Sequence, residues 1–424
     1  MAESAPGPRS ADPLLRNRPY QAMFWSQTCT DLAEQFLIVS IAWAALHTFG
    51  GGRLGLVLAA WAIPRGLLLL FGGVLADRKD RRAVGISVGA LLCLLNLAAS
   101  AITHRSELWA WLALAVCLGV LDAVRLPIGA SMLPLLVDRE RLVQANRWVS
   151  LREWGAMTGG PALGGALVAL LGSGGTLLTA AGMYALSSVL LTLLPPLGRG
   201  REEARKPVLV ELSGGLAFVL RHRRLRVLLP TFAMANLFVL GLIGVGIPLF
   251  AKEVVKAGPQ GLGILSGAFG AGLVLGTLLC HRLPTRWQQS QRVIFGLFMV
   301  SDGLLAVVGF APNLPLAAVA YAAGGLAAGP AATYYRTLLQ ALPPEEYLGR
   351  VNSIARATSF GLEPASTAGV GALSARLSAA TLLIVGGCAA AVVDLTGLVL
   401  SSRRTPTEAD AGSEPLVCAG AQDG

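Results

Sequence analysis

Twelve long apolar runs, separated by short polar segments, make up most of the chain. A helix that crosses a bilayer needs about 20 consecutive, mostly apolar residues. Runs of that length lie at residues 20–48, 54–76, 83–103, 108–136, 143–171, 175–197, 227–250, 261–283, 291–311, 314–341, 347–374 and 377–401. A polar, basic segment separates the first six runs from the last six. The pattern predicts an all-α membrane protein with twelve transmembrane helices in two six-helix halves.

Composition and charge exclude a soluble and a disordered chain. Hydrophobic residues make up 54% of the 424 residues and charged residues 14%, whereas a soluble domain is about 25% charged. The formal net charge is +10. Most Lys and Arg residues lie in the short gaps between apolar runs, which indicates membrane topology and not nucleic-acid binding. The lipid bilayer is therefore the first predicted partner.

The distribution of basic residues also predicts the orientation in the membrane. With a cytoplasmic N-terminus, the inner segments hold 24 Lys and Arg residues and the outer loops hold 5. Because basic residues are concentrated in cytoplasmic loops, both termini are expected on the cytoplasmic side of the cell membrane. We divide the chain into a disordered tail (1–19), a first half (20–198), a linker (199–226), a second half (227–401) and a second tail (402–424).

The linker ends in an apolar pattern at helical spacing followed by a basic cluster. This part reads VELSGGLAFVLRHRRLRV. It is typical of an amphipathic helix on an anionic membrane surface, although a solvated connector would also fit.

The second half repeats landmarks of the first at a nearly constant offset, which indicates duplication. The matched positions are Gly73 and Gly276, Asp77 and Cys280, and Pro161 and Pro364, each 203 residues apart, and Asp31 and Asn236, 205 apart. Parallel halves around a central site are a common architecture of secondary transporters.

No motif indicates an enzyme, a cofactor or a metal site. The six cysteines show no CxxC or Cys/His ligand spacing. The chain has no G-x-x-x-x-G-K-[ST] nucleotide loop. An ion gradient is therefore the expected source of energy.

The segment GGVLADRKDRR, at residues 72–82 between the second and third runs, carries the strongest motif. It resembles the G-x-x-x-D-R-x-G-R-R loop of the major facilitator superfamily, with Asp80 in place of the second glycine. The matching residues are Gly73, Asp77, Arg78, Arg81 and Arg82. The resemblance implies a conformational lock that opens and closes during alternating access. Positive-inside charge alone would explain only Arg81 and Arg82.

A second motif lies in the fifth run, which reads GAMTGGPALGG at residues 155–165. It is similar to the G-x-x-x-G-P-x-x-G-G motif of antiporters in this superfamily, with Gly155 one residue out of register. Gly160, Pro161, Gly164 and Gly165 match. Small residues allow helices to approach closely and proline bends a helix, so this segment is expected to seal or hinge the pathway.

The resemblance extends over nearly the whole chain and is closest to the branch that holds macrolide, enterobactin and other small-molecule exporters. It implies a proton-coupled exporter of a small amphiphilic molecule, working as a monomer. A proton-coupled or facilitative importer on the same fold, a lipid flippase and a non-transporting receptor remain alternatives, because a fold does not determine a function.

Two acids in the first run are the candidate proton carriers. Asp31 and Glu34 are three residues apart and share one face of a helix, and a carboxylate inside a membrane is a functional candidate by default. A like charge nearby makes the second ionisation harder, so one acid can load and release a proton. Our hypothesis is that Asp31 titrates and Glu34 modulates it. Arg125 in the fourth run could neutralise either acid, or could pair with Asp122 one turn before it.

Other polar residues inside the runs are weaker candidates. Asn236, Tyr334, Tyr335 and Arg336 could face a central cavity or could serve packing. Arg65 is expected to be structural. Several of the tryptophans near outer helix ends are expected to anchor helices at the membrane interface; these are Trp43, Trp61, Trp109 and Trp111. The partners of Arg356, Glu363, Asp302 and Asp394 cannot be assigned from the sequence.

Overall fold

The computed structural model describes residues 17–78, 80–103, 105, 107–137, 142–196, 216–282, 284, 287, 290–344, 347, 350–351, 354–355, 357–358 and 361–402. Both predicted tails lie almost wholly outside these residues, as does the linker before residue 216. Arg356 also lies outside. Within the described residues the chain is helical and contains no strand.

The described helices follow the predicted runs closely. In the first half they are α1 (Arg18–Phe49), α2 (Gly51–Arg78), α3 (Arg81–Ile102), α4 (Leu108–Leu136) and α5 (Leu142–Thr192). In the second half they are α7 (Arg223–Gly241), η3 (Leu242–Gly246), α8 (Ile247–Glu253), α9 (Gly258–Leu279), η4 (Cys280–Arg282), α11 (Gln291–Val308), α12 (Leu314–Ala341), α14 (Glu363–Leu373) and α15 (Ala379–Ser402).

Local sequence explains where several helices begin and end. The side chain of Asn17 accepts a hydrogen bond from the backbone N–H of Tyr20 and caps α1, which ends before Gly50 at a φ of 78°. Asp80 caps α3 in the same way. Gly172 interrupts α5 with a φ of 73°, a conformation that glycine adopts without strain. The break lies between the predicted runs 143–171 and 175–197.

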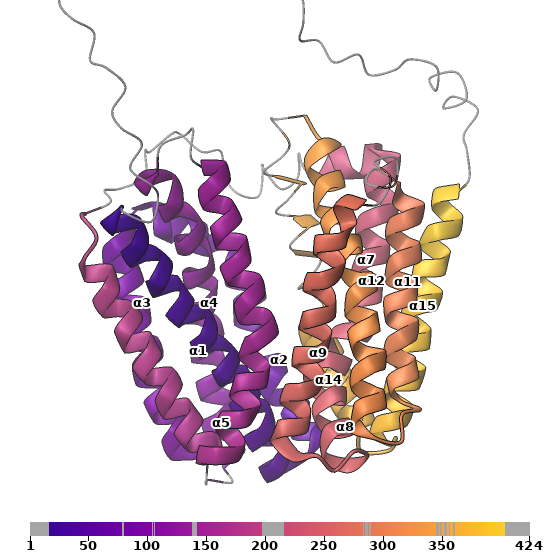
Figure 1. Ribbon diagram of the computed structural model, residues 1–424, viewed down its shortest axis with the longest axis horizontal. Helices are drawn as coiled ribbons and strands as arrows, with labels where there is room; N and C mark the ends of the chain where they lie inside the picture. The colour runs from indigo at the N-terminus through magenta and orange to yellow at the C-terminus, as the bar shows by residue number, and fades with distance from the viewer. Residues whose placement is uncertain are drawn as a thin grey trace, which may run out of the picture.

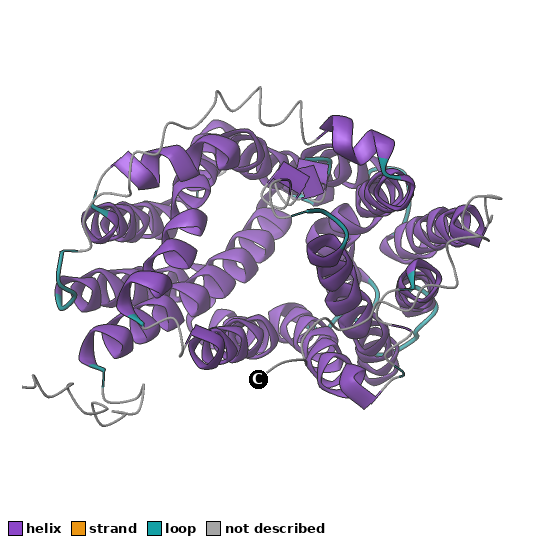
Figure 2. Cartoon of the chain, turned by 90° about the horizontal axis from the view of Figure 1, so that it is seen from above, coloured by secondary structure: helices purple, strands orange, loops and turns teal. Residues whose placement is uncertain are grey.

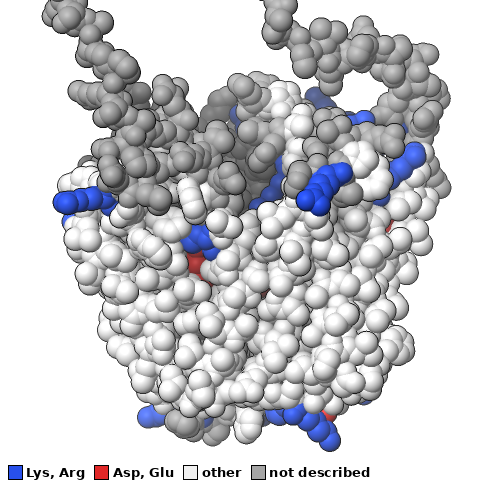
Figure 3. Space-filling model, in the orientation of Figure 1, with Lys and Arg blue, Asp and Glu red and all other residues white. Residues whose placement is uncertain are grey.

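Nine helical stretches among the described residues are long and apolar enough to cross a membrane, judged by length and composition. One of them, Leu151–Thr192, includes the break at Gly172. The predicted total of twelve helices therefore stays a prediction. Figure 3 shows Lys and Arg residues towards the two ends of the molecule and an almost uncharged belt between them.

The helices form two bundles, α1–α5 and α7–α15, which lie side by side (Figures 1 and 2). α1 begins and α15 ends at the same end of the molecule, which we call the terminal end (Figure 1). The largest buried cluster contains residues of both bundles, such as Leu46, Leu54 and Phe250. Towards the terminal end each bundle has a separate cluster, one around Met132 and one around Phe295. The bundles therefore join mainly at the opposite end.

Two helix pairs hold the bundles together, α5 with α9 and α2 with α14. In terms of the predicted runs, the fifth run of each half packs against the second run of the other half. This exchange is the arrangement expected of two duplicated halves related by an approximate twofold axis.

Candidate functional site

A group of charged side chains from both bundles lies inside the membrane-spanning part. At its centre, Arg125 of α4 contacts two acids at once. Its Nη2 atom lies 2.7 Å from Oε2 of Glu34 on α1, and its Nε atom lies 3.2 Å from Oδ1 of Asp122 one turn earlier. The other oxygen of Asp122 accepts a hydrogen bond of 2.8 Å from the indole N–H of Trp61 on α2.

Asp31 has a different partner. Its Oδ2 atom lies 3.3 Å from Nε of Arg152 on α5, whose side chain is 7% exposed. Arg152 also lies 3.4 Å from Glu153, which is 59% exposed. Asp31 and Glu34 thus share a face of α1 as predicted, but each is held by an arginine from a different helix.

A third ion pair connects the two bundles. Arg65 of α2 contacts Glu363 at the start of α14 through Nη2 and Oε2, and both side chains are partly buried. Arg65 also interacts electrostatically with Asp122 and Glu34. The pair is therefore connected to the charges around Arg125.

The seven groups form one network with more acids than arginines. Four carboxyl groups (Asp31, Glu34, Asp122 and Glu363) lie close to three guanidinium groups (Arg65, Arg125 and Arg152). Glu34 and Asp122 both form an ion pair with the guanidinium of Arg125. Buried charges need a counter-charge, and two acids that compete for one cation favour binding of a proton by one of them. The network can therefore take up a proton without leaving an arginine unpaired.

Sequence reasoning found part of this network. Arg125 was expected to pair either with an acid of the first run or with Asp122, and it does both. The partner of Asp31 is Arg152, which the sequence analysis did not select, although a charge in an apolar run was the available signal. Of the four tryptophans expected near the outer helix ends, Trp61 is 5% exposed, and its indole N–H is bonded to Asp122.

The loop motif connects α2 to α3. Gly73, Asp77 and Arg78 belong to the last turns of α2, but the structure does not describe the side chains in this part of the helix. The guanidinium of Arg82 donates to the backbone oxygens of Leu191, at 3.2 Å, and Thr192, at 2.7 Å. These oxygens lie at the C-terminal end of α5, where a positive charge is stabilising. Both partners of Arg82 belong to its own bundle.

The antiporter-type motif lies on α5 where this helix meets α1 and α9. Gly160 and Gly164 face α1, at Gln35 and Phe36. Gly165 faces the other bundle: a Cβ atom there would lie 2.6 Å from the oxygen of Pro259 and 2.9 Å from Cα of Gly263. A side chain at Gly263 would in turn meet the backbone oxygen of Pro161 at 2.9 Å. The motif therefore allows backbone contact between the bundles.

The four possible cavity residues have different surroundings. Tyr334 is buried and donates a hydrogen bond of 2.9 Å to the backbone oxygen of Cys280. Tyr335 stacks on Phe232 with 4.4 Å between ring centroids. Both tyrosines thus pack in the core of the second bundle. Asn236 is partly buried on α7.

Arg336, the fourth of these residues, is exposed and turns towards the first bundle. Its guanidinium lies 5.7 Å from the ring centroid of Trp154 on α5, a distance that allows a cation–π interaction. Arg336 therefore contacts the other bundle.

Asp302 of α11 and Asp394 of α15 are partners of each other. Both are buried, and their carboxyl groups lie next to each other. Two adjacent carboxylates repel each other, and a proton shared between them removes the repulsion. α11 and α15 lie on the side of the second bundle that faces away from the first (Figure 1). This pair is therefore separate from the network around Arg125.

An apolar groove runs along the first bundle next to Arg152. It has a volume of about 590 Å³ and is lined mainly by residues of α1 and α5, among them Phe24, Trp25, Trp148 and Leu151. Among the described residues, no three His, Cys, Asp or Glu side chains are grouped so that they could hold a metal ion. The site is thus a combination of ion pairs and apolar walls.

Residues 23–362 match the Major Facilitator Superfamily. The match covers most of the chain, which therefore belongs to this superfamily. The protein is a multi-pass membrane transporter and not an enzyme, and the resemblance described from the motifs is confirmed.

Several known transporters are similar to the chain. The multidrug efflux pump Tap of Mycolicibacterium fortuitum is 27% identical over 342 residues, which cover 77% of this chain and 82% of the pump. The enterobactin exporter EntS of Salmonella typhi is 27% identical over 436 aligned positions, which cover 94% of this chain and 97% of the exporter. A crystal structure of a mutant of the nucleoside transporter NupG has a TM-score of 0.73 at 12% identity and covers 90% of this chain and 99% of its own.

Proposed function

We propose that this protein exports a small amphiphilic molecule in exchange for protons, by alternating access between its two halves. The single observation that carries the proposal is the shared contact of Arg125 with Glu34 and Asp122. We further propose twelve transmembrane helices, a position in the cell membrane with both termini in the cytoplasm, and a monomer as the working unit.

In this mechanism Glu34, rather than Asp31, carries the proton. Asp31 has Arg152 as a partner, whereas Glu34 shares Arg125 with Asp122. Protonation of Glu34 leaves Arg125 paired with Asp122, and a polar group of the substrate that binds the carboxylate of Glu34 competes with the proton for it. Arg65 interacts electrostatically with Glu34 and forms an ion pair with Glu363 of the other half. Protonation of Glu34 therefore also changes the electrostatic force on the Arg65–Glu363 pair.

Two observations support export of an amphiphilic substrate. The relatives include a multidrug efflux pump and an enterobactin exporter. The groove beside Arg152 places aromatic walls next to a charge, which suits a molecule with an apolar body and a polar group.

We also propose that the loop at residues 72–82 locks the cytoplasmic side. The family resemblance supports this role, and the bonds of Arg82 fix the start of α3 against the end of α5 within the first bundle. Asp77→Asn is expected to lower transport sharply in a protein that still inserts and folds. Labelling of single cysteines should show the cytoplasmic side open more often; unchanged transport and labelling would contradict the lock.

The test of coupling uses purified protein in liposomes with an imposed pH gradient and two probes, enterobactin and ethidium. We expect Glu34→Gln to abolish gradient-driven movement of the transported probe while downhill movement continues. Glu153→Gln is the matched control, because this acid also lies beside an arginine, Arg152, but is mostly exposed, and it should behave like the wild type.

Three results would contradict parts of the proposal. Gradient-driven transport that survives in Glu34→Gln and is lost in Asp31→Asn would make Asp31 the carrier. Transport in the opposite direction would identify an importer. Binding of a probe without any movement would indicate a receptor.

A further inference from the structure

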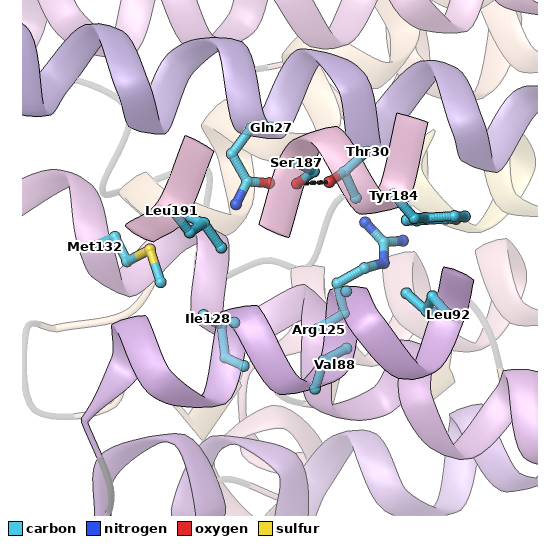
Figure 4. A pocket seen from close by; sticks show the side chains of 12 residues that line it. Gln27, Thr30, Val88, Leu92, Arg125, Ile128, Met132, Tyr184, Ser187 and Leu191 are labelled. Carbon is cyan, nitrogen blue, oxygen red and sulfur yellow. Dashed lines mark hydrogen bonds between the residues drawn. The ribbon is translucent and has the colours of Figure 1, made fainter. Parts of the chain in front are cut away.

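A narrow pocket lies inside the first bundle, between α1, α3, α4 and the second part of α5 (Figure 4). Arg125 reaches into it from α4, and Thr30, Tyr184 and Ser187 line the same part. Figure 4 shows the guanidinium of Arg125 pointing towards Thr30 and lying beside Tyr184. The pocket therefore reaches the proposed proton site from within one bundle, away from the contact between the two halves.

The polar part of the pocket contains a chain of hydroxyl groups. The hydroxyl oxygens of Thr30 and Ser187 are 2.8 Å apart, and those of Ser187 and Ser26 are also 2.8 Å apart. Thr30 lies one helical turn before Glu34 on α1. These three hydroxyl groups can relay a proton from one to the next, because each can both donate and accept a hydrogen bond.

Tyr184 gives an independent indication that water occupies the pocket. Its side chain is 1% exposed, and its hydroxyl group has no hydrogen-bond partner among the described residues. A buried hydroxyl without a partner is unfavourable, and buried waters typically satisfy such groups where two or more polar partners converge. The widest part of the pocket has room for about one or two water molecules.

The other end of the pocket lies close to the terminal end of the molecule and is apolar. Gly85 is near the start of α3, and Met132 and Leu191 are near the ends of α4 and α5. A Cβ atom at Gly85 would lie 3.0 Å from Leu191 and 3.2 Å from Met132. The flexible side chains of Leu191 and Met132 thus close the pocket within about two helical turns of the terminal end of the molecule.

We infer that this pocket is a hydrated route by which protons reach the Glu34–Arg125 pair from the terminal end, separate from the path of the substrate between the halves. A proton from water is passed to the carboxylate of Glu34 along water, Tyr184 and the hydroxyl chain. Each hydroxyl group donates one proton and accepts another, so it carries one proton again after the transfer. The charged groups at the inner end are Arg125 and its partners Glu34 and Asp122. This inference rests on the proposed function.

The first arm of the test measures hydration without any substrate. X-ray radiolysis produces hydroxyl radicals from bound water, and these radicals label neighbouring side chains. Tyr184 and Met132 are buried but should be labelled strongly, because the pocket water touches them. Tyr321 and Met23 are equally buried and do not line the pocket, so they serve as controls. Labelling of Tyr184 and Met132 no stronger than that of the controls would show a dry pocket and overturn the inference.

The second arm measures proton uptake by the detergent-purified full chain after photolysis of a caged proton, read with a pH-indicator dye. Tyr184→Phe and Thr30→Val should bind as many protons as the wild type but at least about fivefold more slowly. Ser188→Ala is the matched control, because this neighbouring hydroxyl bonds to backbone oxygens of Tyr184 and Ile86 and does not line the pocket. Wild-type rates in both pocket variants would overturn the route, even if the pocket is wet.

The same measurement separates this inference from the proposed function. Glu34→Gln should reduce the number of protons bound, whereas the pocket variants should change only the rate. An unchanged proton number in Glu34→Gln would contradict the proposed carrier. A reduced number in Glu34→Gln together with wild-type rates in the pocket variants would leave the carrier in place and reject the route.

Discussion

Single residues in the membrane-spanning part are held by partners from other helices. Trp61, Asp122, Arg125 and Glu34 come from three helices and form one connected set of contacts. In a region without water, a polar group that loses its partner cannot find another easily. Substitutions that remove one partner should therefore have clear effects on stability.

Trp61→Phe should destabilise the protein by about 1.5–3 kcal/mol, the typical value of a hydrogen bond to a charged group. The substitution keeps an aromatic ring but removes the N–H that Asp122 accepts. Thermal unfolding in detergent measures the loss. Trp109→Phe is the control, because Trp109 is 72% exposed; equal melting temperatures of the two variants would show that the bond is unimportant.

Asp302 and Asp394 should tolerate an amide but not an apolar side chain. Asp394→Asn supplies an N–H donor in place of the shared proton, so the melting temperature should stay close to that of the wild type. Asp394→Leu leaves the buried Asp302 without its partner and should cost about 1–3 kcal/mol. If both variants melt alike, the contact between the two carboxyl groups does not contribute to stability.

At the scale of helices, contact between the bundles depends on small residues. At the crossing of α5 and α9, Gly165 and Gly263 lie backbone to backbone, and Gly55 and Gly371 do the same where α2 meets α14. Helices that cross at glycines can approach closely and gain from packing along the backbone. The repeated sequence places these contacts in corresponding parts of the two halves.

Gly165→Ala should weaken the closed contact between α5 and α9. The added methyl group would meet backbone atoms at 2.6 and 2.9 Å, and backbone cannot move aside as a flexible side chain can. We expect a longer distance between spin labels on α5 and α9 and transport reduced about tenfold or more. Gly155→Ala on the same helix meets no atom within 4 Å and should be neutral, whereas similar effects of both would point to a general loss of helix flexibility.

For the whole molecule, the ion pair between Arg65 of α2 and Glu363 of α14 joins the two bundles. The pair lies next to the charges around Arg125. It can therefore connect the protonation state of the first bundle to the separation of the two halves.

A double-mutant cycle tests this connection. Arg65→Gln and Glu363→Gln should each destabilise the protein, and the double variant should be less harmful than the sum of the two. The expected coupling is about 0.5–3 kcal/mol, the range for residues in contact, measured on the free energy of unfolding in detergent. Additive effects would show that the two side chains do not act as a pair.

The sequence alone determined the class of protein and most of its helices. Apolar runs of sufficient length have few stable alternatives to a spanning helix, because backbone polar groups in lipid must bond within their own segment. The family followed from the loop at residues 72–82 and the motif at 155–165, since their residue order is distinctive. The acids and arginines of the network were visible as charges in apolar runs.

Only the tertiary structure decided which charges are partners. Asp31 pairs with Arg152 and Glu363 with Arg65, over 121 and 298 positions of the chain. Trp61 lies inside the bundle and not at its edge, and Tyr334 and Tyr335 pack in a core. A sequence shows the periodicity of each helix, but the rotation and neighbours of that helix depend on how all the helices pack together. Ion pairs between helices depend on that packing, and so does the pocket beside Arg125.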